Sequence, residues 1–404
     1  MKVLYVTLGL PYPPVVGAQI RDFELVRRIS EWAAVRVVAL AESAPEAGAM
    51  EEMARVVEQV DAIVVPTALS ARLLRRLPSH LWAGRPPATL PFVRPSAVAA
   101  LRTIMSKWKP DIFQVEHSFL APYLAAVPPG DPCRTVLSMH NVGEVQYERI
   151  RESADGIVAR AVAGLKSRAM RGWEVDRARR YDSTVVVSEA DRDHLLARDA
   201  SLHLCVVPNG VDTGLRRPLP PATGHGLLFV GNLAYSPNAE AVHFFCDEVL
   251  PSVQMHVPDA TFTIVGAGAP ARVQALDDRP GVTVAGLVPD VEPYYGASAA
   301  CVVPLRAGSG TRLKILEAMA LGRPVVSTTV GCEGLAVSHG EHLLVADDPV
   351  ALAREVVRLL QDPFEGQRLA RRARARVEEQ YDWGASADRL HALYTELVLR
   401  GADA

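Results

Sequence analysis

The chain has 404 residues, of which 49% are hydrophobic and 22% charged, and its 43 basic and 46 acidic side chains leave a formal net charge of −3. This composition excludes a disordered chain, and it excludes collagen-like or disulfide-stapled proteins, which need far more glycine or cysteine than 28 and 5. The length predicts two or three domains, and the near-neutral charge excludes a global attraction for nucleic acid, so that any polyanion site has to be a local patch.

The first half of the chain predicts a parallel sheet. Short runs rich in β-branched residues alternate with longer helical segments, and most runs are almost continuously apolar, as strands covered by helices on both faces are. The predicted strands are residues 3–7, 35–40, 62–65, 112–115, 135–139 and 183–187.

The loop after the first predicted strand carries Gly17 at the point where a helix begins. Bare amides at a helix N-terminus can approach an anion or a sugar hydroxyl closely. A plain tight turn explains a single glycine equally well.

A basic stretch follows the third predicted strand. No acidic residue lies between Asp61 and Asp111, whereas arginines and lysines accumulate there beside Trp82, Phe92 and Trp108. Such a stretch, taken as residues 71–109, could dock on anionic lipid. The alternative is a solvated face with helix-stabilising arginines.

Two histidine segments follow strands of this first half. His117 comes after the fourth strand, and His140 and Asn141 end the fifth. Ligands of open parallel sheets bind beyond the carboxyl ends of the strands, so these side chains are candidates for ligand contacts.

Residues 209–226 are rich in glycine and proline and lack periodicity, which is typical of an interdomain connection. The alternation then starts again. The predicted strands of the second half are residues 227–230, 261–265, 282–285, 300–304, 324–327 and 342–345. Two such units predict an α/β protein of two doubly wound parallel-sheet domains that face a central cleft.

A Gly-x-Gly pattern, Gly266 and Gly268, follows the strand at 261–265. Rossmann dinucleotide sites begin in this way, but Ala271 replaces the third glycine, and the unit is not at the start of its domain. A nicotinamide-dependent oxidoreductase is therefore only a minor alternative.

The strand at 300–304 leads into a glycine-rich loop and a helix. Gly308 and Gly310 lie in the loop, Thr311 is the predicted N-cap, and Gly322 is the predicted helix stop. Backbone amides and the positive end of the helix dipole favour an anion at this place.

Two cations, Arg312 and Lys314, fall in the predicted first turn and make the anion site suited to a diphosphate. Glu317 lies one turn beyond Lys314, where a carboxylate would accept hydrogen bonds from a ribose diol. An intrahelical Lys314–Glu317 ion pair explains the spacing equally well.

Residues 308–334 resemble the donor-binding signature of the retaining GT-B glycosyltransferases of family 4. The segments 11–17, 139–142, 187–191, 207–212 and 229–238 fit the same family, so the resemblance spans nearly the whole chain. It is greatest to the sugar transferases of exopolysaccharide systems. It implies an acceptor-binding Rossmann-like domain over 1–205, a donor-binding Rossmann-like domain over 206–383, and a last helix within 384–404 that crosses back to the first domain.

The resemblance implies transfer of a sugar, with retention, from a nucleotide-diphosphate sugar to a glycan, a lipid-linked sugar or a small metabolite. It implies no metal and no other cofactor, and the sequence offers no aspartate pair suited to Mg²⁺ beside a diphosphate. Glu317 matches the second glutamate of the family's Glu-x7-Glu motif, which binds the ribose. Ser309 stands where the family usually has the first glutamate, which contacts the donor sugar.

The resemblance also assigns further site residues. Donor contacts fall on Gly17, Asn209, Gly231 and Asn232, and on the loop formed by Gly308, Ser309, Gly310 and Thr311. His117 matches a sugar-contacting histidine and is a predicted catalytic residue, whereas His140 and Asn141 are assigned to the acceptor side.

The family commonly places an arginine and a lysine after the first strand of the donor domain, where they neutralise the phosphates. This chain has Asn232 and Asn238 there, and we expect Arg312 and Lys314 to take over that role as catalytic cations. Because Ser309 and the two asparagines depart from the family pattern, a non-catalytic nucleotide-sugar-binding homologue is the second alternative.

The remaining patterns concern metal sites and location. His339 and His342 have metal-like spacing, but without a third ligand we expect a turn. The five cysteines are scattered without a Cys-x-x-Cys pair, which is typical of a reducing compartment. The N-terminal apolar run is too short for a signal sequence, so we expect a cytoplasmic protein, with peripheral membrane contact through 71–109 as the alternative to a freely diffusing one.

Overall fold

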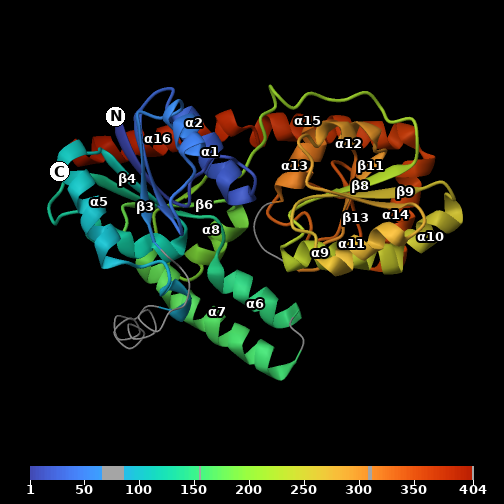
Figure 1. The fold of residues 1–404 in the computed structure, drawn as a ribbon, viewed down its shortest axis with the longest axis horizontal. Helices are drawn as coiled ribbons and strands as arrows, with labels where there is room; N and C mark the ends of the chain where they lie inside the picture. Colours follow the sequence, from blue (N-terminus) through green and yellow to red (C-terminus); the bar gives the residue numbers. More distant parts are fainter. Residues whose placement is uncertain (66–85, 154–155, 308–311, 403–404) are drawn as a thin grey trace. The chain divides into compact units, whose positions relative to one another are not determined.

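The computed structural model describes residues 1–65, 86–153, 156–307 and 312–402 (Figure 1). They form two compact units, one of residues 1–208 with 386–404 and the other of residues 209–385. Each unit is a parallel sheet flanked by helices, which confirms the predicted pair of Rossmann-like domains.

The first unit contains a seven-stranded parallel sheet in the order β3-β2-β1-β4-β5-β6-β7. Its strands are β1 (Lys2–Leu8), β2 (Ala34–Ala41), β3 (Gln59–Val64), β4 (Ile112–Glu116), β5 (Arg134–Met139), β6 (Ser183–Val186) and β7 (Leu204–Val206). Its helices are α1 (Gly17–Ile29), α2 (Ala47–Ala54), α5 (Pro95–Trp108), α6 (Gly143–Ser153), α7 (Ile157–Ala178), α8 (Glu189–Leu196) and, from Ser386 onward, α16 (Trp383–Ala402). The strand order reverses between β1 and β4, and a sheet of this kind binds ligands at that reversal.

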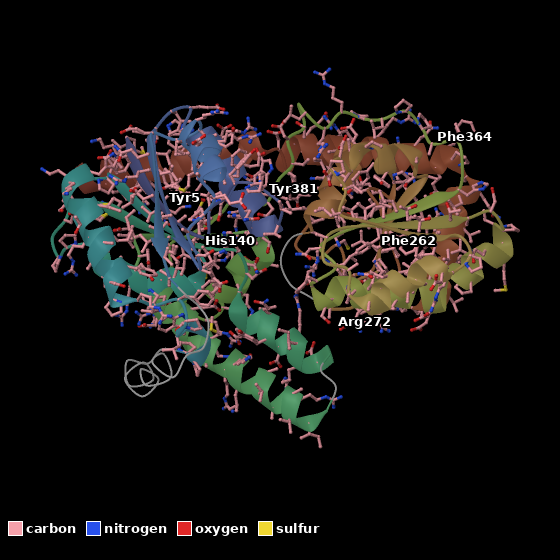
Figure 2. The ribbon with its side chains drawn as sticks, in the orientation of Figure 1. Tyr5, His140, Phe262, Arg272, Phe364 and Tyr381 are labelled. Carbon is pink, nitrogen blue, oxygen red and sulfur yellow. The ribbon has the colours of Figure 1, made fainter. Side chains whose placement is uncertain are left out.

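The second unit contains a six-stranded parallel sheet in the order β10-β9-β8-β11-β12-β13. Its strands are β8 (Gly226–Val230), β9 (Thr261–Val265), β10 (Val282–Gly286), β11 (Ala300–Val303), β12 (Val325–Ser327) and β13 (Leu344–Val345). Its main helices are α9 (Ser236–Phe244), α10 (Leu250–His256), α12 (Glu292–Ala297), α13 (Leu313–Ala320), α14 (Pro349–Gln361) and α15 (Pro363–Gln380). Figure 2 shows Phe262 of β9 inside this unit, where it is fully buried, and Phe364 of α15 at its surface.

The connecting segment 209–225 packs as part of the second unit. It contains no helix or strand apart from a bridge between Val211 and Asp382. Arg374 of α15 fixes it by donating hydrogen bonds to the carbonyls of Thr213 and Arg216, and it also donates to Ala320 of α13. The segment is therefore anchored to the helix that carries Lys314 and Glu317.

The predicted start of α13 was wrong by one residue. Arg312 occupies the N-cap position in an extended conformation, with φ −87° and ψ 90°, so Leu313 is the first helical residue. Thr311, the predicted N-cap, lies outside the described residues. The predicted stop is confirmed, because Gly322 has φ +70° and its amide donates to Met319.

Candidate functional site

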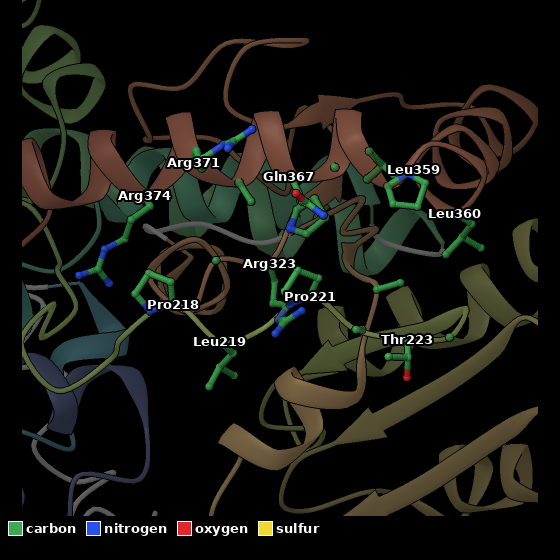
Figure 3. A pocket seen from close by; sticks show the side chains of 18 of the residues that line it. Pro218, Leu219, Pro221, Thr223, Arg323, Leu359, Leu360, Gln367, Arg371 and Arg374 are labelled. Atoms are coloured by element: carbon green, nitrogen blue, oxygen red, sulfur yellow. The ribbon is translucent and has the colours of Figure 1, made fainter.

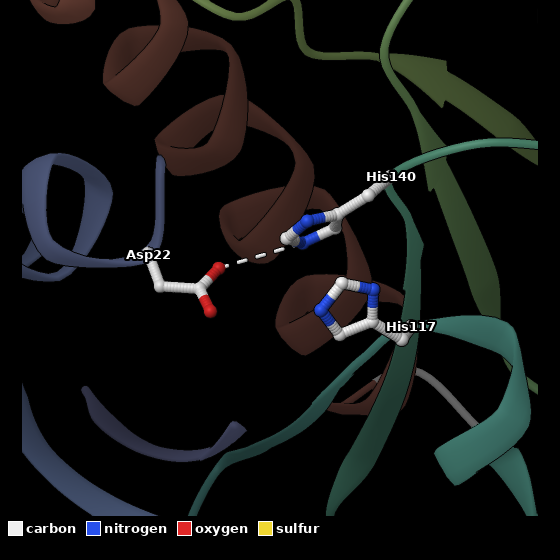
Figure 4. Close-up of side chains that lie close together, drawn as sticks. All are labelled: Asp22, His117 and His140. Carbon is white, nitrogen blue, oxygen red and sulfur yellow. Dashed lines mark ion pairs between the residues drawn. The ribbon is translucent and has the colours of Figure 1, made fainter. Parts of the chain in front are cut away.

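A cluster of buried polar side chains lies where β4 and β5 end and α1 passes (Figure 4). The Nε2 atom of His140 lies 2.6 Å from Oε2 of Glu116 and 3.4 Å from Oδ1 of Asp22. The rings of His117 and His140 are 3.9 Å apart between centroids. His117 has φ +67°, a conformation that side-chain-bearing residues rarely adopt, so the backbone is strained where it presents this ring.

The protonation states in this cluster depend on burial and on the oppositely charged side chains that face one another. Burial alone would lower the pKa of His140, but the carboxylates of Asp22 and Glu116 outweigh it and raise the pKa to about 9. Burial would raise the pKa of Glu116, but the hydrogen bond from His140 dominates and lowers it to about 2. Burial and the positive His140 hold the pKa of His117 well below its usual value. At neutral pH, His140 is therefore a cation, and His117 is a neutral imidazole that can accept a hydrogen bond from a hydroxyl.

A cavity of about 290 Å³ opens beside this cluster. Its wall contains His117, His140 and Asn141, three of the residues predicted from sequence. The remaining wall is formed by Thr89, Phe92, Ser118, Phe119, Gly143, Gln146, Tyr147 and Met170. Aromatic rings beside a few polar groups suit a sugar-like or similarly amphipathic ligand.

Glu174 of α7 joins two walls of this cavity, although no motif in the sequence indicates it. It is 1% exposed and accepts hydrogen bonds from the Ser118 hydroxyl at 2.9 Å and the Gly143 amide at 3.0 Å. Burial, against these hydrogen bonds, raises its pKa to about 7.

Gly17 begins α1, as predicted, but it does not line the cavity. The preceding amide, that of Val16, donates to the Gln19 side chain, and Gly17 itself is exposed. The same helix carries Asp22 into the histidine cluster.

In the second unit, the side chain of Lys314, from α13, reaches the loop that follows β8. Its Nζ atom donates to Oδ1 of Asn238 at 2.9 Å and lies 3.9 Å from the centre of the Phe229 ring. Asn238 in turn donates to the carbonyl of Asn232 at 2.8 Å. A Cβ atom on Gly231 would lie 2.6 Å from Nζ, so a glycine is needed for this approach. Burial lowers the pKa of Lys314 well below its usual value, and the nearby charge of Arg312 lowers it further.

Glu317 has partners other than Lys314. Its Oε1 atom lies 3.0 Å from Nη2 of Arg216, and its Oε2 atom accepts a hydrogen bond from the Tyr295 hydroxyl at 3.2 Å. The alternative of an intrahelical Lys314–Glu317 ion pair was therefore wrong. Burial raises the pKa of Glu317, against the charge of Arg216.

The glycines after β9 have a packing role. A Cβ atom on Gly266 would lie 1.8 Å from the carbonyl oxygen of Gly231, and one on Gly268 would lie 2.8 Å from the Ala234 side chain. The loops after β8 and β9 thus touch through glycines, which explains the Gly-x-Gly pattern without a dinucleotide.

Of the other predicted donor contacts, the structure describes Asn209 and not the loop 308–311. Asn209 begins the second unit beside Gly210, where a Cβ atom would meet the Tyr381 carbonyl at 2.7 Å, so this turn packs against the start of the last helical segment. Gly308, Ser309, Gly310 and Thr311 lie outside the described residues.

Asp22, His117 and His140 are the one group of three metal-ligating side chains found among the described residues, with ligand atoms within 4.8 Å of one another. The ring of His140 holds a proton between two carboxylates, whereas a metal requires a neutral histidine. The pair His339 and His342 forms a turn, because each Nδ1 accepts a backbone amide, from Val345 and Ser338 respectively.

The basic stretch 71–109 is only partly described, since residues 66–85, and with them Trp82, lie outside the described residues. Trp108 is 7% exposed and packs in the core, and the Phe92 ring packs on Phe119 at 4.7 Å. Trp108 is therefore not available to lipid, and the alternative of lipid docking by this stretch stays a prediction.

A second cavity, of about 460 Å³, lies at the amino ends of β8, β11 and β12 (Figure 3). Figure 3 shows Gln367 and Arg371 of α15 on one side of it and Pro218, Leu219 and Pro221 of the connecting segment on the other. Because ligands of parallel sheets bind at the carboxyl ends, this cavity is at the wrong edge for the donor.

Two family models match the chain in succession. The model described as Glycosyltransferase Family 4 matches residues 34–215, and the model described as Glycosyl transferases group 1 matches residues 224–362. Together with the two Rossmann-like sheets, these matches show that the chain belongs to the family 4 glycosyltransferases of the GT-B fold.

The chain is similar to several known proteins. An uncharacterized 44.6 kDa protein of the cps region of Klebsiella pneumoniae is 27% identical over 39% of this chain and 42% of that protein. The glycogen synthase of Mycobacterium tuberculosis is 28% identical over 71% of this chain and 69% of the synthase. The match thus spans less than half the length of the Klebsiella protein.

Solved structures share the fold. Sucrose-phosphate synthase from Thermosynechococcus elongatus has a TM-score of 0.73 at 19% identity and covers 99% of this chain and 100% of its own. Anabaena HepE in complex with UDP has a TM-score of 0.71 at 16% identity, with coverages of 98% and 100%. In the described part of this chain, no helix is both long and apolar enough to cross a membrane.

Proposed function

We propose that the chain is a retaining glycosyltransferase that moves a sugar from a nucleotide-diphosphate sugar to a hydroxyl group of a glycan, a lipid-linked sugar or a small metabolite, without a metal. The observation that carries the proposal is the position of Lys314, whose Nζ atom reaches the loop after β8 and is oriented by Asn238. This is the place where the family commonly has its phosphate-binding cations.

The chemistry requires positive charge at this place. The bond between the anomeric carbon and the diphosphate breaks, and negative charge develops on the leaving diphosphate, so a preorganised cation lowers the barrier. The new bond forms between the anomeric carbon and the acceptor oxygen, and a phosphate oxygen takes the acceptor proton. Glu317, half-buried and oriented by Arg216 and Tyr295, would accept hydrogen bonds from the hydroxyl groups of the ribose.

The acceptor side of the proposal rests on the 290 Å³ cavity. A neutral His117 can accept a hydrogen bond from a sugar hydroxyl. Its ring packs against the ring of His140, which is itself held by Glu116 and Asp22. Asn141 adds an amide that can both donate and accept.

For the donor, we propose a uridine nucleotide, because Anabaena HepE is solved with UDP-glucose and a Staphylococcus aureus TarM mutant with UDP. UDP is expected to raise the melting temperature of the chain, since a ligand at 100 times its Kd stabilises the folded state by about 2.7 kcal/mol. Thermal-shift measurement with UDP, GDP, ADP and dTDP checks this. A response to GDP, ADP or dTDP but not UDP would overturn the choice of base, and no response to any of the four would contradict the donor site.

A further inference from the structure

The hairpin of α6 and α7 carries large apolar side chains at its far end that no described residue of the unit covers. Figure 1 shows the two helices extending side by side beyond the strands of their sheet. At this end Ile157 is 85% exposed, Val158 77% and Leu165 70%. Ile150 and Val162 are also exposed. Contiguous exposed apolar surface of this kind usually marks an interaction site.

Helix α7 is apolar on two opposite faces. Its inner face buries Ala163, Ser167, Met170 and Trp173. Its outer face presents Val158, Val162, Leu165 and Ala169, which recur at the i, i+4, i+7, i+11 spacing of one helix face. A surface helix ordinarily has a polar outer face, so packing within the unit does not explain this second apolar stripe.

Basic residues border the stripe. At 100° per residue, Lys166 falls on one edge of it and Arg168 falls on the other. From Ile157 to Trp173 the helix has no acidic residue. An apolar face between two cationic edges is typical of a helix that lies in the interface of an anionic membrane, where the cations contact lipid phosphates.

We propose that the outer face of α7 docks on an anionic lipid surface. The base of the same hairpin supplies Gln146, Tyr147 and Met170 to the 290 Å³ cavity. Docking through the far end would therefore hold that cavity close to the lipid headgroups, where an amphiphilic acceptor is available. The proposed surface differs from the stretch 71–109, whose described aromatic residues pack inside the unit.

Flotation of the full chain with vesicles tests the proposal without measuring transfer. The chain is expected to float with vesicles of phosphatidylcholine and phosphatidylglycerol, and to stay in solution with phosphatidylcholine alone or at high salt. The double variant V158S/L165S is expected to lower partitioning roughly tenfold or more through lost apolar contact. The variant K166Q/R168Q is expected to lower it by a similar factor through lost charge.

The matched control is V350S/F364S, which removes two side chains of equal exposure, 74% and 83%, from the second unit and is expected to float like the unmodified chain. Thermal unfolding of each variant confirms that it is folded. Absence of flotation with anionic vesicles, or unchanged flotation of V158S/L165S, would overturn the proposal. So would light scattering that showed a dimer abolished by V158S/L165S together with no vesicle binding. Because flotation needs no turnover, failure here leaves the transferase proposal standing.

Discussion

Replacing Lys314 by alanine is expected to lower kcat/KM for the nucleotide-sugar donor by about 10²- to 10³-fold, the usual cost of removing a group that stabilises the charge developed in the transition state. Lys314 is held by Asn238 against the loop after β8, so its amino group is positioned before the donor binds. Burial and the nearby charge of Arg312 depress its pKa, and a bound diphosphate would favour the charged form. Steady-state kinetics of donor turnover gives the measurement.

A further variant tests whether the position of the Lys314 amino group matters, and a second one serves as the control. In Gly231→Ala the new methyl group would lie 2.6 Å from Nζ, so the flexible end of Lys314 has to move. We expect a smaller loss of turnover with little change in melting temperature. Lys107→Ala is the matched control, because Lys107 is exposed in the first unit. Unchanged turnover and donor affinity in Lys314→Ala would show that the assignment is wrong.

Replacing His140 by alanine is expected to lower the stability of the first unit by about 3 to 5 kcal/mol near neutral pH, because it removes the cation paired with two buried carboxylates and leaves them only the charge of Arg21 nearby. Glu116 is fully buried and Asp22 is 2% exposed, so both carboxylates are shielded from bulk solvent. Hydrogen exchange of the β4 and β5 amides reports this free energy. His203→Ala is the matched control and is expected to cost less than about 0.5 kcal/mol, since that side chain is 37% exposed.

The loss of stability in His140→Ala should depend on pH. In the unmodified chain, the raised pKa of His140 gives stability that is complete below its unfolded value and is lost as pH rises through about 9. In His140→Ala, the carboxyl pKa values rise, so the variant regains stability as pH falls and the carboxyls take up protons. The difference between the two proteins should be largest near pH 6, where Asp22 titrates, and should shrink as pH rises toward 9. A pH-independent difference would contradict the ionic origin.

The predicted strands are found because helices cover both faces of each sheet, which forces the strand sequences to be continuously apolar. Strand β7 (Leu204–Val206) gave no such signal, since it is three residues long and only half-buried at the sheet edge. The start of α13 was placed too early because Thr311 is a favourable N-cap residue, whereas the structure uses the extended backbone of Arg312 without a side-chain cap.

The residues of the candidate site were predictable where they directly follow a strand. They were not predictable where they reach the site from helices distant in the sequence. His117, His140 and Asn141 follow β4 and β5, so the topology alone brings them to one cavity. Asp22 and Glu174 come from helices whose packing the sequence did not reveal. Glu116 had one recognisable sign, a charged residue within a strand that is otherwise buried.

The donor side shows the same limit. Asn238 departs from the family pattern, because it stands where a charged residue is common. Its amide oxygen nevertheless orients the amino group of Lys314. Arg216 lies in the irregular connecting segment, where no periodicity indicates that it reaches Glu317.

The most direct measurement is transfer from a panel of UDP-, GDP-, ADP- and dTDP-sugars to a broad acceptor set, with and without a metal chelator. The account predicts a glycosylated product that keeps the anomeric configuration of the donor, formed at the same rate with the chelator and strongly reduced in Lys314→Ala. Nucleotide-sugar binding without any turnover would contradict it and favour the non-catalytic homologue.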